Sequence, residues 1–146
     1  MGLLPTGVTV VTAIGPNGRS GATASAVGSL SLDPMLMLVC LDRASRTLRS
    51  VQEAGRFGIN VLGAGQEAVA RQFSTKLDEA EKWAGVESAE RDGIPALGGT
   101  VLWIGCELQD VLMGGDHVIL TGAVADLEAR GGDPLVHHRG AYRGLD

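Results

Sequence analysis

An Asn17-Gly18 pair between two β-type segments is the short feature that most constrains the fold. Residues 7–14 are rich in Val, Thr and Ile, and residues 20–27 are small or carry hydroxyls. Asn-Gly is the strongest short-range hairpin signal, because Asn and Gly tolerate the positive φ angles of a tight β-turn. The sequence therefore predicts that the chain opens with an antiparallel pair. The small side chains of the second strand leave room for another group to approach it closely.

The rest of the chain is predicted to consist of strands joined by turns or short helices. The continuous apolar run 35–41 is typical of a central strand covered on both faces. A turn at 30–34 precedes it, and a helix runs from an N-cap at Ser45 to a stop at Gly55. The other predicted elements are a helix over 66–73 and strands over 56–62, 100–112, 117–127 and 134–142. No strand–helix–strand series repeats, so the pattern favours an antiparallel barrel over a doubly wound parallel sheet.

Residues 76–92 differ from the rest in charge. They carry three basic and six acidic side chains around Trp83, which gives a net charge of −3. This composition predicts a solvated helix or excursion. With 146 residues and no repeat or linker, the chain is expected to form a single domain over 1–146.

Composition excludes several classes of protein. The net charge is −5 without a basic stripe, which argues against nucleic acid as a partner. No apolar run reaches the ~18 residues of a membrane span, and no basic region precedes the apolar start, so neither a membrane helix nor a signal peptide is predicted. Cys40 and Cys106 lie in apolar runs and are expected to be reduced thiols of a cytoplasmic protein, with no metal site.

One nucleotide-binding motif is present but is not taken as a site. Residues 63–68 read GAGQEA, which fits the G-x-G-x-x-A dinucleotide fingerprint. That fingerprint requires a second parallel strand soon afterwards, and here the charged segment follows instead. We therefore expect a strand-to-helix turn in which Gly supplies the bend.

A candidate anion site lies at the start of the first helix. A helix N-terminus offers unpaired N–H groups and a partial positive charge. Ser45 and Thr47 add hydroxyl donors there, and Arg43 and Arg46 add charge-assisted donors. A phosphate is the natural ligand. From these residues alone the alternative, a plain N-cap with solvated arginines, stays equally open.

Two further groups of residues have the chemistry of a ligand site. The segment 21–26 alternates small residues and hydroxyls, which suits a planar polar ring read by main-chain groups, or a tightly packed strand. His117 follows two glycines at a strand start, and His137 and His138 precede Arg139. Neighbouring residues of a strand point to opposite faces, so the histidines do not suggest a metal site. One imidazole beside a redox ring could orient a hydride donor, although His137 could equally be a loop residue without a role.

Taken together in order, seven stretches resemble the short-chain flavin reductases, the flavin reductase-like, FMN-binding split-barrel proteins. The stretches are residues 5–12 (PTGVTVVT), 23–26 (TASA), 29–34 (SLSLDP), 45–47 (SRT), 56–62 (RFGINVL), 114–117 (GGDH) and 138–142 (HRGAY). The resemblance covers residues 5–143. It implies a mainly β fold, a six-stranded antiparallel split β-barrel of Greek-key type with a few short helices, and a homodimer with flavin near the interface.

The resemblance also implies a role for particular residues. The isoalloxazine ring and ribityl chain would be held by Thr23, Ala24, Ser25, Ala26 and Ser31, with Cys40, Leu41 and Asp42 passing beside the ring. The phosphate would be taken by Ser45, Arg46 and Thr47, and Phe73 and Lys76 match a Phe-x-x-Lys pair near the flavin. Nicotinamide would lie by His117 and Tyr142, with His138 and Arg139 beside them, and His117 is the expected catalytic residue.

The implied reaction is hydride transfer from NADH or NADPH to FMN or FAD, with reduced flavin passed to a partner flavin-dependent monooxygenase. The cofactor supplies the chemistry, so no protein nucleophile is needed. Two alternatives stay open. One is a non-catalytic flavin-binding split barrel, which would have no need of His117 and Tyr142. The other is an oxidase of a phosphorylated vitamin such as pyridoxamine phosphate, which would need more Arg and Lys than the sequence shows. The sequence does not separate FMN from FAD or NADH from NADPH.

Overall fold

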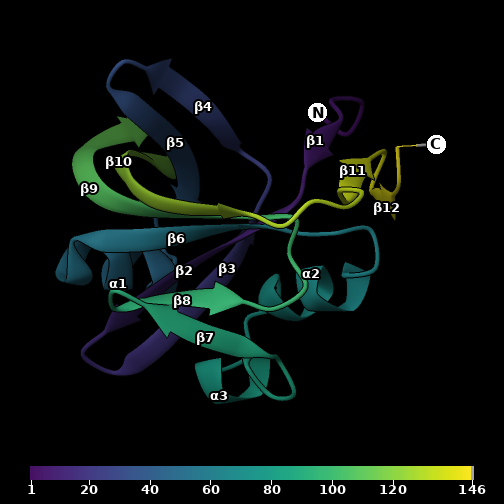
Figure 1. The fold of residues 1–146 in the computed structure, drawn as a ribbon, viewed down its shortest axis with the longest axis horizontal. Coiled ribbons are helices and arrows are strands. Elements are labelled where there is room, and N and C mark those ends of the chain that lie inside the picture. Colours follow the sequence, from purple (N-terminus) through teal and green to yellow (C-terminus); the bar gives the residue numbers. More distant parts are fainter. Residues whose placement is uncertain (146) are drawn as a thin grey trace.

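A seven-stranded antiparallel sheet, curved into a barrel, is the body of the protein in the computed structural model, which describes residues 1–145 (Figure 1). The strands follow the order β3-β2-β6-β9-β10-β5-β4. Their bounds are β2 Thr9–Gly15, β3 Gly18–Ala24, β4 Val27–Leu32, β5 Met35–Asp42, β6 Arg56–Val61, β9 Leu102–Gly114 and β10 His117–Ala129. The mainly β, antiparallel architecture is confirmed, with seven strands in this sheet where the resemblance implied six.

The predicted first hairpin is present, but its turn lies one residue earlier than expected. Gly15 pairs with Gly18, so the two turn residues are Pro16 and Asn17. Proline fixes φ near −65°, and it therefore cannot take the positive φ that the first position of a type I′ turn requires. The positive angle falls instead on Gly18, at φ 102°.

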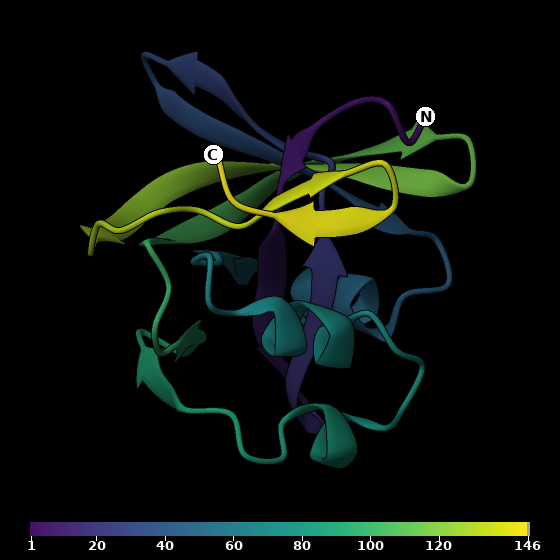
Figure 2. The same ribbon diagram turned by 90° about the vertical axis from the view of Figure 1, so that its right-hand side faces the viewer.

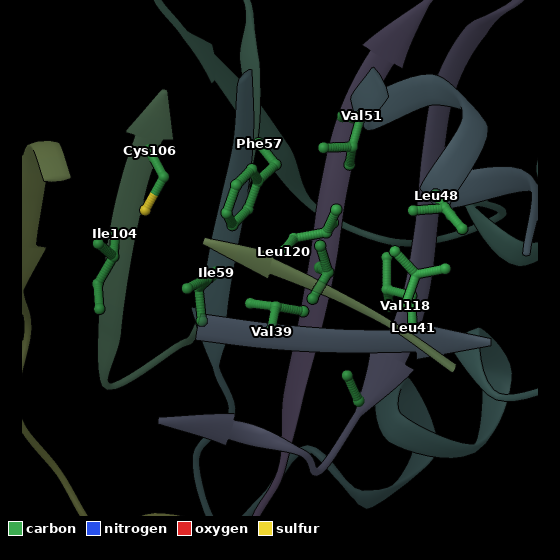
Figure 3. Packing of buried hydrophobic residues seen from close by; sticks show 13 residues of the cluster. Val39, Leu41, Leu48, Val51, Phe57, Ile59, Ile104, Cys106, Val118 and Leu120 are labelled. Carbon is green, nitrogen blue, oxygen red and sulfur yellow. The ribbon is translucent and has the colours of Figure 1, made fainter. Parts of the chain in front are cut away.

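Helix α1, Arg46–Ala54, packs on β2 and β3 and begins and ends where the sequence predicts. The Ser45 side chain accepts a hydrogen bond from the Leu48 N–H at 3.3 Å, and Gly55 ends the helix with φ 72°. Leu48 and Val51 join the main core inside the barrel, where Phe57, Ile59 and Leu120 are fully buried (Figure 3).

The charged segment forms a largely exposed excursion and not a continuous solvated helix, so the second of its two expected forms is the one observed. Helix α2, Glu67–Phe73, is followed by a single helical turn, α3 Glu79–Lys82, and by a hairpin of β7 Ser88–Arg91 and β8 Ile94–Leu97. Trp83 is buried and meets the Phe73 ring edge to face at a centroid distance of 5.0 Å. Lys82 is also buried. The segment therefore covers a second core cluster beside the barrel.

Three other sequence expectations are corrected. Residues 30–32 belong to β4, because Ser31 and Leu32 pair with Leu36 and Met35 of β5, and Asp33-Pro34 alone makes the turn. Strand β5 is not covered on both faces, since only Val39 and Leu41 are buried in it. Residues 134–142 do not form one strand.

The C-terminal segment is instead a hairpin of β11 Val136–His138 and β12 Ala141–Arg143, which pairs with β1 Thr6–Gly7 near the N-terminus (Figure 2). Arg139 and Gly140 both have positive φ, 55° and 72°, as a tight hairpin turn requires. The declined dinucleotide motif lies between β6 and α2, and β6 has antiparallel partners on both sides, β2 and β9, so no βαβ unit forms there. Within residues 1–145, no helix has the length and apolar character that a membrane crossing requires.

Candidate functional site

The barrel is split between β3 and β5. These strands lie next to each other, but no ladder of main-chain hydrogen bonds joins them in the described chain. One hydrogen bond links β5 to the residues just after β3, from the Cys40 N–H to the Ala26 carbonyl oxygen at 2.9 Å. Two adjoining cavities of about 220 and 490 Å³ open along this split. They share Ala22, Thr23, Asp42 and Ser45, and together they are called the groove below.

Most of the predicted site residues meet in this groove, although they come from distant parts of the chain. The first cavity is lined by Thr23, Ala24, Ser25, Ala26, Cys40, Leu41, Asp42, Ser45 and His117. The second cavity adds Arg46, Thr47, Phe73 and Lys76. Small side chains on β3 leave main-chain groups accessible at the strand edge, which is what a flat polar ligand requires.

Four predicted residues lie outside the groove lining. Ser31 pairs with Leu36 in the β4–β5 hairpin. Tyr142 contacts His137 at a ring distance of 5.5 Å and has the Arg71 guanidinium 5.4 Å from its ring centroid. His138 and Arg139 stand at the end of the same hairpin, outside the groove.

His137, and not His138, lies nearer the groove. It lines a third cavity of about 600 Å³, which shares Ser25 and Ala26 with the groove. Neighbouring strand residues point to opposite sides, so only one of the two histidines, His137, lines this cavity. The sequence offered no basis for this choice, because the direction of β11 depends on its pairing with β1.

The start of α1 forms a cationic end of the groove. Ser45 both caps the helix and lines the groove, so the two alternatives for this residue are compatible. Arg46 donates to the Leu77 carbonyl oxygen and has its Nε 3.8 Å from a Glu79 carboxylate oxygen. Lys76 forms no ion pair within residues 1–145. Arg46, Lys76 and Lys82 thus face one lining carboxylate, Asp42, in the second cavity.

Two predicted ligand hydroxyls are already engaged by the protein. Thr47 is 1% exposed, and its hydroxyl lies 2.8 Å from the Ser20 hydroxyl. Thr23 donates its hydroxyl to the Ala70 carbonyl oxygen at 2.7 Å and thereby ties β3 to α2. Both hydroxyls are therefore engaged within the protein, and both residues help to shape the groove.

Lys82 is a charged lining residue that sequence reasoning missed, as it did the small residues Ala44, Ser74 and Thr75. Its Nζ donates to the Gly21 carbonyl oxygen at 3.0 Å and lies 3.9 Å from Glu79. Burial lowers the pKa of Lys82 below its ordinary value; the Glu79 carboxylate opposes this shift and Arg46 adds to it. In the sequence Lys82 is one charge among many in an acidic segment, so nothing local indicated its position.

His117 lines the first cavity and stands where β10 begins, opposite the end of β5 at Asp42. Its Nδ1 lies 2.8 Å from a carboxylate oxygen of Asp116. This hydrogen bond holds the pKa of the Asp116 carboxyl below its usual value. Asp116 thus fixes one ring nitrogen, which leaves the other free toward a ligand.

Comparison with known proteins identifies the family of the chain. Residues 1–146 match the family model of the flavin reductase like domain. The chain belongs to the flavin reductase-like family. The fold and the enzyme class predicted from the sequence, a flavin reductase, are confirmed.

Relatives and solved structures cover nearly the whole chain. The flavin reductase (NADH) of Kitasatospora aureofaciens is 39% identical over 146 residues, which cover 97% of this chain and 76% of that protein. A longer Rhizobium meliloti relative is 42% identical over 143 residues and 97% of this chain, and the chain spans only 45% of its length.

Two solved structures are similar along their length. Nitrilotriacetate monooxygenase component B from Mycobacterium thermoresistibile superposes with a TM-score of 0.93 at 34% identity, over 99% of this chain and 82% of that one. The NADH:FAD oxidoreductase SgcE6 of Streptomyces globisporus, in complex with NAD and FAD fragments, gives 0.91 at 31% identity, over 97% of this chain and 86% of that one.

Proposed function

We propose that this chain oxidises NADH or NADPH, reduces FMN or FAD held in the groove, and supplies the reduced flavin to a partner monooxygenase. The observation that supports the proposal best is the groove itself. Its first cavity offers main-chain edges and small side chains, and its second offers a helix N-terminus with Arg46 and Lys76. A flavin nucleotide joins a planar ring to a phosphate. The ring suits the first cavity, and the phosphate suits the helix N-terminus and basic side chains of the second.

The residues that line the groove offer suitable partners to the ring of a flavin and to its phosphate. Residues 22–26 present main-chain N–H and C=O groups to a ring edge, and Cys40 and Leu41 border its face. At the other end, the Ser45 hydroxyl and the first N–H groups of α1 can donate to a phosphate. Four predicted site residues do not line the groove: Ser31, His138, Arg139 and Tyr142. That they contact flavin or nicotinamide therefore stays a prediction.

The flavin, when bound, would supply the hydride-accepting chemistry. The protein's part is orientation. His117 lines the first cavity and its side chain is 43% exposed, so a nicotinamide arriving from solvent would meet it. Because its Nδ1 is held by Asp116, its Nε2 can hydrogen-bond to a nicotinamide amide group and set the distance of hydride transfer.

The function is tested by NAD(P)H consumption in the presence of each flavin. We expect oxidation that depends on added FMN or FAD and that differs between NADH and NADPH. One relative is named an NADH-dependent FMN reductase, and another an NADH:FAD oxidoreductase. Both flavins are therefore assayed. If flavin binds but neither nucleotide is oxidised above the buffer rate, the chain is a flavin-binding module and the enzymatic proposal fails.

We propose further that two chains form the homodimer implied by the resemblance. Exposed apolar side chains gather on β4, β5 and the end of β9, at Leu30, Leu32, Met35, Val111, Leu112 and Met113. Such side chains on β9 and β5, which flank β10, and on the edge strand β4 suit a symmetric contact between two copies. Sedimentation should give twice the 15.1 kDa of one chain, and Leu32→Glu should shift the mass to that of a single chain. A wild-type protein that sediments as one chain at micromolar concentration contradicts the dimer.

A further inference from the structure

Lys82 is a buried cation at the edge of the groove. It is 5% exposed, yet it lines the second cavity with Ser45, Arg46 and Lys76. An ammonium group has three donors. One of them is used, toward the Gly21 carbonyl oxygen, and the described chain offers no other acceptor within hydrogen-bond distance. Burial of a charge with so few partners is unfavourable unless something compensates it.

The nearest carboxylate does not provide that compensation in full. Glu79 stays 3.9 Å from Nζ, beyond hydrogen-bond distance. Its two oxygens accept from the Ser20 hydroxyl at 3.1 Å and from the Trp83 Nε1 at 3.2 Å. Glu79 also does not line the second cavity, so an anion there would meet the positive charges and not this carboxylate.

We propose that Lys82 is an anion-binding residue of the groove, which takes the flavin phosphate together with Ser45 and the first turn of α1. The assignment rests on the proposed function, because it presumes that a flavin occupies the groove. The ammonium group, carried by α3, would donate to the phosphate in the cavity that the start of α1 also lines. Gly21 holds it in place, since a hydrogen bond to the main chain of β3 fixes Nζ relative to the same strand that borders the ring.

The test compares FMN with riboflavin, which has the same ring but no phosphate. Lys82→Met and Lys82→Gln are titrated with both flavins by fluorescence, and the melting temperature of each variant is recorded. A charge-assisted hydrogen bond to phosphate predicts a loss of roughly ten- to hundredfold in FMN affinity. Riboflavin affinity should stay within about twofold of wild type. Lys82→Gln keeps a donor for the Gly21 carbonyl, which separates loss of charge from loss of that contact.

Arg49→Met is the matched control. It also removes one positive charge from this region, at an exposed residue of α1 that does not line the groove. We expect it to change FMN affinity by less than about threefold, because exposed charges are screened by solvent.

A second measurement needs no variant in Lys82. The sequence holds two lysines, Lys76 and Lys82. Selective isotope labelling therefore gives two sets of side-chain signals, which Lys76→Arg assigns. FMN should shift the Lys82 signal and riboflavin should not.

Several results would overturn the assignment. Equal loss of FMN and riboflavin affinity means that Lys82 only supports the fold. An unchanged FMN affinity with a raised KM for NADH assigns the anion to the nucleotide instead. An FMN titration that leaves the Lys82 signal unmoved also overturns it. A wild-type protein that binds neither flavin contradicts the proposed function itself, and the assignment falls with it.

Discussion

The barrel has one closed side and one split side, and they use main-chain hydrogen bonds in opposite ways. On the closed side, β2, β6, β9 and β10 form a continuous ladder. Asn60 is fully buried there and is satisfied: its amide donates to the Val10 carbonyl oxygen at 2.9 Å, and its oxygen accepts from the Leu97 N–H at 2.8 Å. On the split side, β3 and β5 face each other without a ladder.

The difference separates stability from binding. The closed side carries the large buried side chains, among them Phe57, Ile59 and Trp103, and its polar groups are used up within the protein. The split side has small residues and strand edges whose polar groups remain available to a ligand. Substitutions on the closed side should therefore change the free energy of unfolding, and those on the split side should change flavin binding and reduction.

The largest expected effect is on the closed side, at Phe57→Ala. Removal of a fully buried Phe leaves a cavity and should lower the free energy of unfolding by about 3–5 kcal/mol. Denaturant unfolding measures the loss. The FMN affinity of the folded fraction should stay within about twofold of wild type, because Phe57 does not line the groove. A large fall in FMN affinity without loss of stability would contradict the assignment of stability to the closed side and of binding to the split side.

On the split side, His117→Ala should slow flavin reduction more than any other change. If His117 orients the nicotinamide, a misplacement of about 1 Å costs on the order of a hundredfold in rate. Stopped-flow reduction of flavin-loaded protein by NADH or NADPH measures this, next to an FMN titration and a thermal melt. Asp116→Asn, which keeps an acceptor for Nδ1, is the control and should slow reduction less. A normal rate with a lowered melting point would make His117 a structural residue.

Ser45→Ala tests the residue that belongs to both the fold and the groove. Loss of the N-cap should cost about 1 kcal/mol of stability. Loss of a donor to phosphate should cost roughly 1.5–3 kcal/mol in FMN binding. Thr47→Ala is the contrast, because its hydroxyl is bonded to Ser20: it should lower stability and leave FMN affinity unchanged. Equal FMN affinities for wild type and Ser45→Ala would place the phosphate elsewhere.

Local signals in the sequence predict most of the barrel. The first hairpin, α1 with its two caps, and the long β9–β10 pair each carry their own turn or cap residues. Strand β4 and the β7–β8 hairpin were missed. Leu30 and Leu32 stand next to a proline turn, and β8 contains Pro95 within an acidic neighbourhood. In each case the pairing partner, not the local pattern, decides the strand.

The groove is harder to predict than the barrel from local signals in the sequence. Its residues come from β3, β5, α1, the segment after α2 and the start of β10, so spacing alone does not bring them together. The family resemblance named them together, and most of the residues it named line the groove. It did not indicate Lys82, whose burial depends on a carbonyl 61 residues away in sequence, or the choice between His137 and His138.

The smallest expected effect concerns the closed side at high pH. Burial raises the pKa of the Cys106 thiol from 9.0 to about 12, and the neutral thiol is therefore favoured in the folded state. Unfolding releases a proton from this group above pH 9, so the stability it contributes is present below pH 9 and is lost progressively as the pH rises toward 12. The slope is at most about 1.4 kcal/mol per pH unit. Cys106→Ala should be less stable at pH 7 because of the cavity, yet its free energy of unfolding should fall less between pH 9 and 10.5 than that of wild type. Equal falls in the two proteins would show that water reaches Cys106, and the side of the barrel described as closed would then be open.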